Sequence, residues 1–204
     1  MNIAVFGGTF DPFHNGHRHI AEYILNKHLA ECILFVPAAI PPHKNDKLIS
    51  PYPIRRKLLE LGTQGMSGIR ISDIEQEREE KSYTIDTLAE LKLQTPDDNF
   101  LLIIGGDSLA SLHLWHRAHE LVQNYPILTY PRPGCDITEK SLPKFWNINE
   151  KRKLLASLMP DAPVMDVSST QLRRLFASGK IPDSSLVPEE ESKWIIQQKL
   201  YTKD

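Results

Sequence analysis

Two histidines, His14 and His17, stand three residues apart just after a pair of glycines, and this spacing suits chemistry on a phosphate. The apolar run that ends at Gly7 and Gly8 predicts a strand, and the residues from about Gly16 onward predict a helix. Glycine lets the main chain approach phosphate oxygens because no Cβ stands in the way, and a helix start adds free N–H groups and positive partial charge. Both imidazoles would lie on one side of this turn and could donate hydrogen bonds to one phosphate.

This turn matches neither of two common phosphate-binding loops. The segment contains no G-x-G-x-x-G for a dinucleotide and no G-K-[ST] of a P-loop. Nucleotidyl transfer depends on alignment and charge neutralisation more than on covalent help, and two histidines at a helix start can supply both. A His-x-x-His metal site is the alternative, but no third ligand stands nearby in the sequence. We therefore predict no metal ligand from the protein.

A second candidate phosphate site lies near the C-terminus. The hydroxyls of Ser168, Ser169 and Thr170 can cap a predicted helix over residues 171–177, and Arg173 follows within its first turn. The free N–H groups of that turn could hold phosphate oxygens, to which arginine offers a planar fork of donors. An ordinary N-capped amphipathic helix fits the same residues.

A candidate ribose ligand follows a strongly apolar run. Gly105 and Asp107 come directly after the predicted strand at residues 100–104. A carboxylate at the carboxyl end of a parallel strand can accept hydrogen bonds from ribose hydroxyls. A helix N-cap is an equally good role for Asp107, and the two roles are compatible.

Strand patterns alternate with helical ones along the whole chain, which predicts an α/β fold with a parallel sheet. We expect a Rossmann-like doubly wound sheet of five to six strands with helices on both faces, forming one domain over residues 1–204 with a helical portion from about residue 168. The predicted strands are 3–6, 33–36, 69–74, 100–104, 127–130 and 164–167. The predicted helices cover about 15–29, 54–61, 84–93, 171–177 and 189–200, with an interrupted helix over 109–122 and Pro-rich loops at 37–53 and 130–143.

Composition excludes several functional classes. The 204 residues carry a formal net charge of −2, so there is no general attraction to nucleic acid or to anionic membranes. No apolar run approaches the 18 or so residues of a membrane span, and the first strand begins too early for a signal peptide. Cys32 and Cys135 are the only cysteines, and Cys32 fits a buried free thiol. We expect a cytoplasmic protein.

The first motif resembles a known superfamily. Gly7-Gly8-Thr9-Phe10-Asp11-Pro12, followed by His14-x-x-His17, is similar to the [ST]-x-x-H and H-x-G-H elements of adenylyl- and cytidylyltransferases. More closely, the chain resembles the bacterial nicotinate-nucleotide adenylyltransferase family from its first strand to about Phe176. The resemblance implies that nicotinate mononucleotide attacks the α-phosphorus of ATP, with Mg2+, releasing pyrophosphate and deamido-NAD in NAD biosynthesis.

The resemblance assigns residues to ATP and to the reaction. Catalytic roles fall on His14, His17 and Arg173. The Ser168–Thr170 segment matches the second signature of the family. The residues expected to bind ATP are Gly7, Gly8, Thr9, Phe10, Gly16, Gly105, Asp107, Ser168, Ser169 and Thr170.

Four residues are expected to bind the mononucleotide. The segments 82–88 and 112–117 look distinctive of the nicotinate branch: Trp115 could stack on the pyridine ring, and the helix start at Thr84 could receive the carboxylate. The resemblance also implies a phosphate contact from Lys44, and Arg132 could reach a phosphate or carboxylate from a stiff loop. The alternatives are a core role for Trp115 and exposed positions without a ligand for Lys44 and Arg132.

Two other functions remain open at this stage. The same chemistry could serve phosphopantetheine or another phosphorylated alcohol as acceptor. A nucleotide-sensing or scaffold protein could retain the fold without turnover, although every expected catalytic position is filled here.

Overall fold

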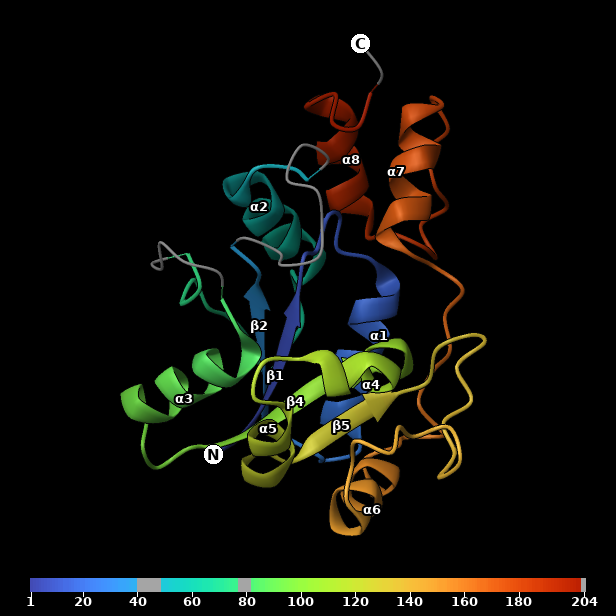
Figure 1. Cartoon of the computed structure of the whole chain (residues 1–204). Helices are drawn as coiled ribbons and strands as arrows, with labels where there is room; N and C mark the ends of the chain where they lie inside the picture. Colours follow the sequence, from blue (N-terminus) through green and yellow to red (C-terminus); the bar gives the residue numbers. More distant parts are fainter. Residues whose placement is uncertain (40–48, 77–81, 203–204) are drawn as a thin grey trace.

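The computed structural model describes residues 1–39, 49–76 and 82–202, and it contains a five-stranded, fully parallel sheet with the order β3-β2-β1-β4-β5 (Figure 1). The strands are β1 (Asn2–Gly8), β2 (Cys32–Pro37), β3 (Ile69–Ile71), β4 (Asn99–Gly105) and β5 (Ile127–Tyr130). The helices are α1 (Asn15–Asn26), α2 (Tyr52–Gly62), α3 (Thr84–Gln94), α4 (Gly106–Ser111), the 3-10 helix η2 (Leu112–Leu114), α5 (Ala118–Asn124), α6 (Ile148–Ala156), α7 (Ser169–Ala177) and α8 (Glu189–Gln197).

The central strand β1 shows why helices cover both faces of the sheet. Its alternate side chains point to opposite faces: Ile3 and Val5 pack with α3, α4 and α5, whereas Ala4 and Phe6 pack with α1. All four are nearly inaccessible to solvent. Strands buried on both faces read as continuous apolar runs, which is typical of parallel sheets. The expected doubly wound α/β fold is confirmed.

A third apolar cluster lies beyond the carboxyl ends of β1 and β2. It joins Leu58 of α2 to Leu172 and Phe176 of α7 and to Ile195 of α8. Figure 1 shows α7 and α8 side by side at this end of the molecule, with α2 next to them. The C-terminal helices therefore close over the sheet edge where both phosphate motifs lie.

The sixth predicted strand is wrong. Residues 164–167 form no strand, although their composition is typical of one. Val164 is 55% exposed, and Val167 is buried against α2, α7 and α8 instead of against the sheet. Within the described residues, the sheet beyond β5 is extended only by a single bridge between Thr129 and Leu158. The segment runs along the sheet edge and delivers the chain to the Ser168 cap of α7.

Most helix predictions are confirmed, with two differences. The predicted helix over 109–122 is interrupted as expected, but it begins earlier, at Gly106, and breaks at Trp115–Arg117 before α5. Helix α6 was not predicted, although Asn147 and Glu150 form a reciprocal capping box at its start. Within the described residues, no helix is long and apolar enough to cross a membrane.

A buried acid joins α8 to α2. Glu191 is fully inaccessible, and an ideal Cβ on Gly62 of α2 would lie 2.7 Å from its Oε2 atom, so glycine leaves room for this carboxyl group. Burial raises the pKa of Glu191 well above its usual value, and the nearby main-chain N–H of Phe13 only partly opposes this. The folded protein therefore favours the neutral acid and is penalised when Glu191 ionises.

We predict that Glu191→Gln stabilises the protein at pH 8 but not at pH 4. Because the folded-state pKa is raised, the unfolded chain releases this proton first, and the wild-type protein loses stability as the pH rises above about 4.5. Glutamine carries no charge and escapes this loss. Thermal unfolding should show the gain, with a Tm increase of about 2–4 °C for each kcal/mol recovered.

The matched control is Glu189→Gln on the same helix, where the carboxylate is 71% exposed and pairs with Lys193. Its Tm should not rise at either pH, because an exposed pair contributes little to stability. An equal rise in the Tm of Glu191→Gln at pH 4 and pH 8 would show that ionisation of Glu191 is not the cause of the stabilisation.

Candidate active site

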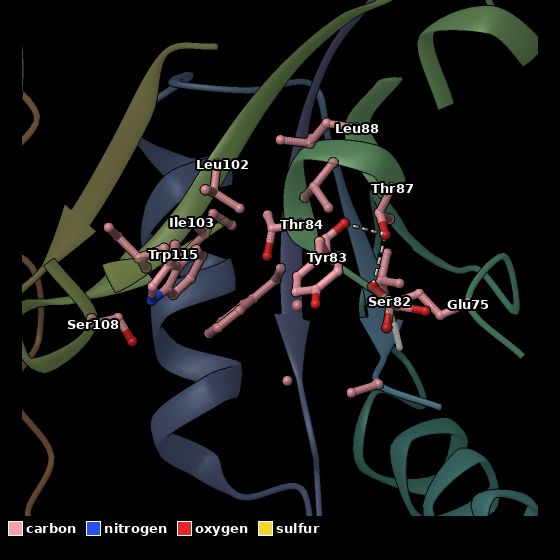
Figure 2. A pocket seen from close by; sticks show the side chains of 18 of the residues that line it. Glu75, Ser82, Tyr83, Thr84, Thr87, Leu88, Leu102, Ile103, Ser108 and Trp115 are labelled. Atoms are coloured by element: carbon pink, nitrogen blue, oxygen red, sulfur yellow. Dashed lines mark hydrogen bonds between the residues drawn. The ribbon is translucent and has the colours of Figure 1, made fainter. Parts of the chain in front are cut away.

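An apolar cavity of about 370 Å3 opens at the carboxyl edge of the sheet, between the ends of β1 and β4 (Figure 2). The strand order reverses direction there, because β2 continues on one side of β1 and β4 lies on the other. Such switch points are where open α/β sheets bind ligands. The cavity brings together the predicted ATP residues Gly7, Gly8, Thr9 and Gly105 and the predicted mononucleotide residues Thr84 and Trp115.

Polar groups converge on one wall of this cavity, at the start of α3. The Ser82 hydroxyl is buried and has no hydrogen-bond partner in the described part of the chain. Thr87 donates a hydrogen bond of 2.9 Å to Glu75, as Figure 2 shows, so these two side chains are already engaged. Among the described residues no side chain caps α3, so none of their side chains pairs with the N–H groups of its first turn, which begins at Thr84. This wall can receive an anionic group.

Trp115 forms another wall of the cavity. It follows η2 and precedes Arg117, whose left-handed conformation (φ 53°) turns the chain into α5. The indole packs only partly against the core, so part of the ring faces the cavity. Next to it, His116 stacks on Tyr83 with ring centroids 4.3 Å apart. The break between η2 and α5 therefore presents an aromatic face to a ligand.

His14 and His17 stack face to face on the other side of β1, at the start of α1. Their ring centroids are 3.7 Å apart, with 22° between the planes. His17 Nδ1 accepts a hydrogen bond of 3.2 Å from the main-chain N–H of His14. A neutral His17 ring then carries its proton on Nε2 and can donate it to a ligand. The expected convergence of the two imidazoles is confirmed.

His14 is only 2% exposed, and its buried Nδ1 atom has no partner in the described part of the chain. Burial, with a smaller contribution from the positive charge of Arg132, lowers the pKa of His14 to about 3. His14 is therefore neutral at physiological pH. A buried polar atom without a partner is uncommon in proteins and is consistent with a missing ligand.

The start of α1 is partly occupied by the C-terminal half of the chain. The N–H of Asn15 already donates to the carbonyl of Leu186, whereas the N–H of Gly16 has no partner among the described residues. An ideal Cβ on Gly16 would lie 2.9 Å from His14 and 3.0 Å from Val167. Glycine is thus favoured here by the packed imidazole and by the chain that leads to α7.

The second phosphate motif lies against the first. The Ser168 side chain caps α7, and the Ser169 hydroxyl donates 2.9 Å to the carbonyl of Pro12. Arg173 donates one hydrogen bond to the carbonyl of Asp11 and another, of 3.3 Å, to the Thr170 hydroxyl. Segments that are more than 150 residues apart therefore meet at one edge, as the two signatures required.

Arg132 lies away from the other described residues of the predicted mononucleotide set. Its guanidinium group is 3.8 Å from Asp107 and lies over the Tyr130 ring at 5.2 Å, and its charge acts on His14. It therefore faces the histidine side of β1 and not the Trp115 cavity. An ideal Cβ on Gly105 would lie 2.4 Å from Asp107, so this glycine permits the carboxylate to fold back over the strand end.

Phe10 and Lys44 are the remaining predicted binding residues. Phe10 is 2% exposed, and its ring packs against Phe6, Phe35 and His17, so only its main chain could touch a nucleotide. The side chain instead supports the His17 imidazole, with ring centroids 5.1 Å apart. Lys44 lies outside the described residues.

Arg55 of α2 is a site residue that the sequence did not reveal. It is 1% exposed and donates hydrogen bonds of 2.7–2.9 Å to the carbonyls of Thr9, Ala38 and Ser50. These carbonyls belong to the chain leaving β1, the chain leaving β2 and the approach to α2. One guanidinium group thus fixes the loops that line the cavity, and nothing in a helical pattern distinguishes it from an exposed arginine.

No group of three or more His, Cys, Asp or Glu side chains within residues 1–39, 49–76 and 82–202 is arranged to hold a metal ion. The buried Asp11 carboxylate already accepts hydrogen bonds from Ser50 and Tyr201. A metal ion that acts here would therefore be held chiefly by the phosphates of a bound nucleotide.

Comparison with known proteins defines the class. The sequence profile of the family described as cytidylyltransferase-like matches residues 5–175, which include both phosphate motifs. The chain belongs to the cytidylyltransferase-like family.

Within this class, full-length relatives narrow the assignment to the nicotinate-nucleotide adenylyltransferases. The chain is 35% identical to "Nicotinate-nucleotide adenylyltransferase" of Bacillus subtilis, with 98% of this chain and 97% of the relative covered. It is 34% identical to "Probable nicotinate-nucleotide adenylyltransferase" of Geobacter metallireducens, with both chains fully covered. The fold also matches a Plasmodium falciparum nicotinic acid mononucleotide adenylyltransferase complexed with NaAD, with a TM-score of 0.77, 20% identity, and 98% of this chain and 97% of that chain covered.

We predict that the His14 imidazole does not titrate between about pH 5 and pH 8 in the free protein, because burial and Arg132 hold its pKa near 3. An added polyphosphate would raise this pKa, since a bound anion stabilises the imidazolium form. Imidazole NMR signals followed against pH, without and with pyrophosphate, measure both effects.

The His14→Gln variant assigns the signal, and His28→Gln, at an exposed position after α1, should remove a different one. A His14 signal that shifts with a midpoint near pH 6.5 in the free protein would contradict the burial argument.

Proposed function

We propose that the chain transfers the AMP part of ATP to nicotinate mononucleotide, producing nicotinate adenine dinucleotide and pyrophosphate, a step of NAD biosynthesis. The observation that carries this proposal is the arrangement of two binding regions on opposite sides of the β1 end, an apolar cavity with an aromatic wall and a helix-start pair of histidines. The names of the full-length relatives support the same reaction.

The nicotinate ring would occupy the apolar cavity. Trp115 offers a stacking surface, and the cavity of about 370 Å3 is at the lower end of the range for small-ligand sites. The nicotinate carboxylate would accept hydrogen bonds from the Ser82 hydroxyl and from the first N–H groups of α3 at Thr84. The mononucleotide phosphate would then extend along Gly7, beside which an ideal Cβ meets no atom within 4 Å.

ATP would lie on the histidine side. The N–H of Gly16, the His14 and His17 imidazoles and the hydroxyls at the start of α7 surround a region suited to phosphate oxygens. Arg173 and, by its position beside His14, Arg132 supply positive charge for the β- and γ-phosphates. Asp107 would accept hydrogen bonds from the adenosine ribose.

The reaction needs no covalent intermediate on the protein. A phosphate oxygen of the mononucleotide forms a bond to the α-phosphorus while the bond to the bridging oxygen breaks, and pyrophosphate leaves with that electron pair. His17 donates from Nε2 to a non-bridging oxygen of the α-phosphate, where negative charge must be neutralised as the bond order changes. Mg2+ would enter with ATP and offset charge on the leaving phosphates.

An acceptor panel tests the proposed function. The purified protein with MgATP should release pyrophosphate with nicotinate mononucleotide, more slowly with nicotinamide mononucleotide, which lacks the carboxylate, and not with phosphopantetheine. If phosphopantetheine were the one acceptor that released pyrophosphate, the proposed acceptor would be wrong and the adenylyl transfer chemistry would stand. No release with any acceptor would favour a nucleotide-binding protein without turnover.

We predict that His17→Ala lowers kcat by about 100- to 1000-fold, because the loss of one preorganised donor to the transferred group costs this much in comparable sites. The dissociation constant for ATP, measured by calorimetry, should change much less, since the donor acts mainly on the transition state. The control is His28→Ala, an exposed histidine. Equal losses in kcat and in ATP affinity would assign His17 to binding instead.

A further inference from the structure

The Asp11 carboxylate is a buried junction between the two ends of the chain. It is 1% exposed, and its Oδ1 atom accepts a hydrogen bond of 2.7 Å from the hydroxyl of Tyr201, which lies 190 residues later. Its Oδ2 atom accepts 3.1 Å from the main-chain N–H of Ser50. Both carboxylate oxygens therefore have a donor that is not an arginine.

Arg173 borders this junction without forming a close ion pair with it. Its Nη1 atom donates to the main-chain carbonyl of Asp11 but lies 4.0 Å from the carboxylate Oδ2. Its Nη2 atom reaches Thr170 at 3.3 Å, which is a long hydrogen bond. The carbonyl of Asp11 thus holds the guanidinium group of Arg173. Because Tyr201 and Ser50 already donate to the Asp11 carboxylate, Arg173 keeps donors for a ligand.

The backbone after α8 explains how Tyr201 reaches Asp11. The helix ends in a Schellman motif, with Lys199 donating to Ile196 and Leu200 donating to Ile195, and this accounts for the left-handed conformation of Lys199 (φ 52°). Tyr201 is left-handed as well (φ 62°), and the motif does not require this. Such a conformation is unfavourable for a residue with a bulky side chain and persists where tertiary contacts impose it.

The contacts of the Tyr201 side chain impose that turn. Its ring lies 6.2 Å from the Phe176 ring of α7, and its hydroxyl points at Asp11. Burial and the negative charge of Asp11 raise the pKa of Tyr201, so the hydroxyl keeps its proton and donates it. The C-terminal segment therefore adopts an unfavourable backbone conformation that delivers one hydroxyl to the first motif.

We propose that Tyr201 is a positioning residue for Arg173: by satisfying Asp11, it keeps this carboxylate from pairing with the arginine and so leaves the guanidinium fork for the phosphates of the nucleotide. This inference rests on the proposed function for the identity of the reaction. Without the Tyr201 hydroxyl, Oδ1 of Asp11 loses the donor that it has in this buried site, and the guanidinium group of Arg173 already lies 4.0 Å from Oδ2 of the same carboxylate. The carboxylate then competes with the phosphates for that side chain.

The test compares Tyr201→Phe with wild type, alone and combined with Arg173→Lys, after thermal unfolding has set a temperature at which all variants are folded. Tyr201→Phe should lower kcat about tenfold and weaken pyrophosphate binding about tenfold, with KM for nicotinate mononucleotide changed less than about twofold. In the Arg173→Lys background, the further loss should be less than about twofold, because the hydroxyl acts through the arginine.

Tyr23→Phe on α1 makes the same chemical change away from this junction and should leave kcat and pyrophosphate affinity at their wild-type values. If Tyr201→Phe lowered kcat and pyrophosphate affinity equally in the wild-type and Arg173→Lys backgrounds, the hydroxyl would have a structural role only, and the inference would be overturned. No change in either quantity would overturn it as well. If the wild-type protein transfers no AMP, the proposed function fails, and pyrophosphate affinity still decides the positioning role of Tyr201.

Discussion

The carbonyl groups at the points where β1 and β2 leave the sheet must be paired, and the buried guanidinium of Arg55 does this for three loops at once. A hydrogen bond from a charged donor contributes about 1.5–3 kcal/mol, and removal of this side chain would take the donor from all three carbonyls. Burial lowers the pKa of Arg55, and the negative charge of nearby Asp11 opposes that shift. Because the cavity and the first motif are built on these loops, their geometry depends on this one side chain.

Two regions of different chemistry follow from the alternation of side chains along β1. One face carries the cluster that ends in the Trp115 cavity, and the other carries the cluster that ends in Phe10 and the stacked histidines. Gly7 and Gly8 lie between them at the end of the strand. Under the proposed function, the two phosphates would meet at a backbone without side chains, which leaves room for the attacking and leaving oxygens to align about the phosphorus.

Charge is distributed unevenly around this edge. His14 is buried and neutral, with the positive charge of Arg132 close enough to depress its pKa, whereas Asp11 is buried among donors. The arrangement leaves positive charge and N–H donors on the side of the histidines and keeps the nearest carboxylate engaged. Under the proposed function, a polyphosphate would meet donors on this side, next to the ion pair of Arg132 and Asp107 at 3.8 Å.

Much of this protein could be predicted from its sequence. Apolar periodicity predicted all five strands of the sheet and most helices, the hydroxyl caps from Ser168 predicted the start of α7, and the turn after Gly8 predicted the start of α1. The predicted adjacency of His14 and His17 is confirmed, and the family assignment from the motif residues is confirmed by the full-length relatives. The capping box of α6 is a local pattern of the same kind and can be read from the sequence as well.

Other features were decided only by the tertiary structure. The run at 164–167 has strand composition yet does not join the sheet, Arg132 faces the histidines instead of Trp115, and Tyr201 reaches Asp11 across 190 residues. Strand and helix patterns, turns and caps are determined by interactions between residues a few positions apart, so the sequence by itself records them. Which distant carboxylate a hydroxyl meets, or which carbonyls a guanidinium pairs, depends on where the packed sheet carries each segment. No local pattern contains that information.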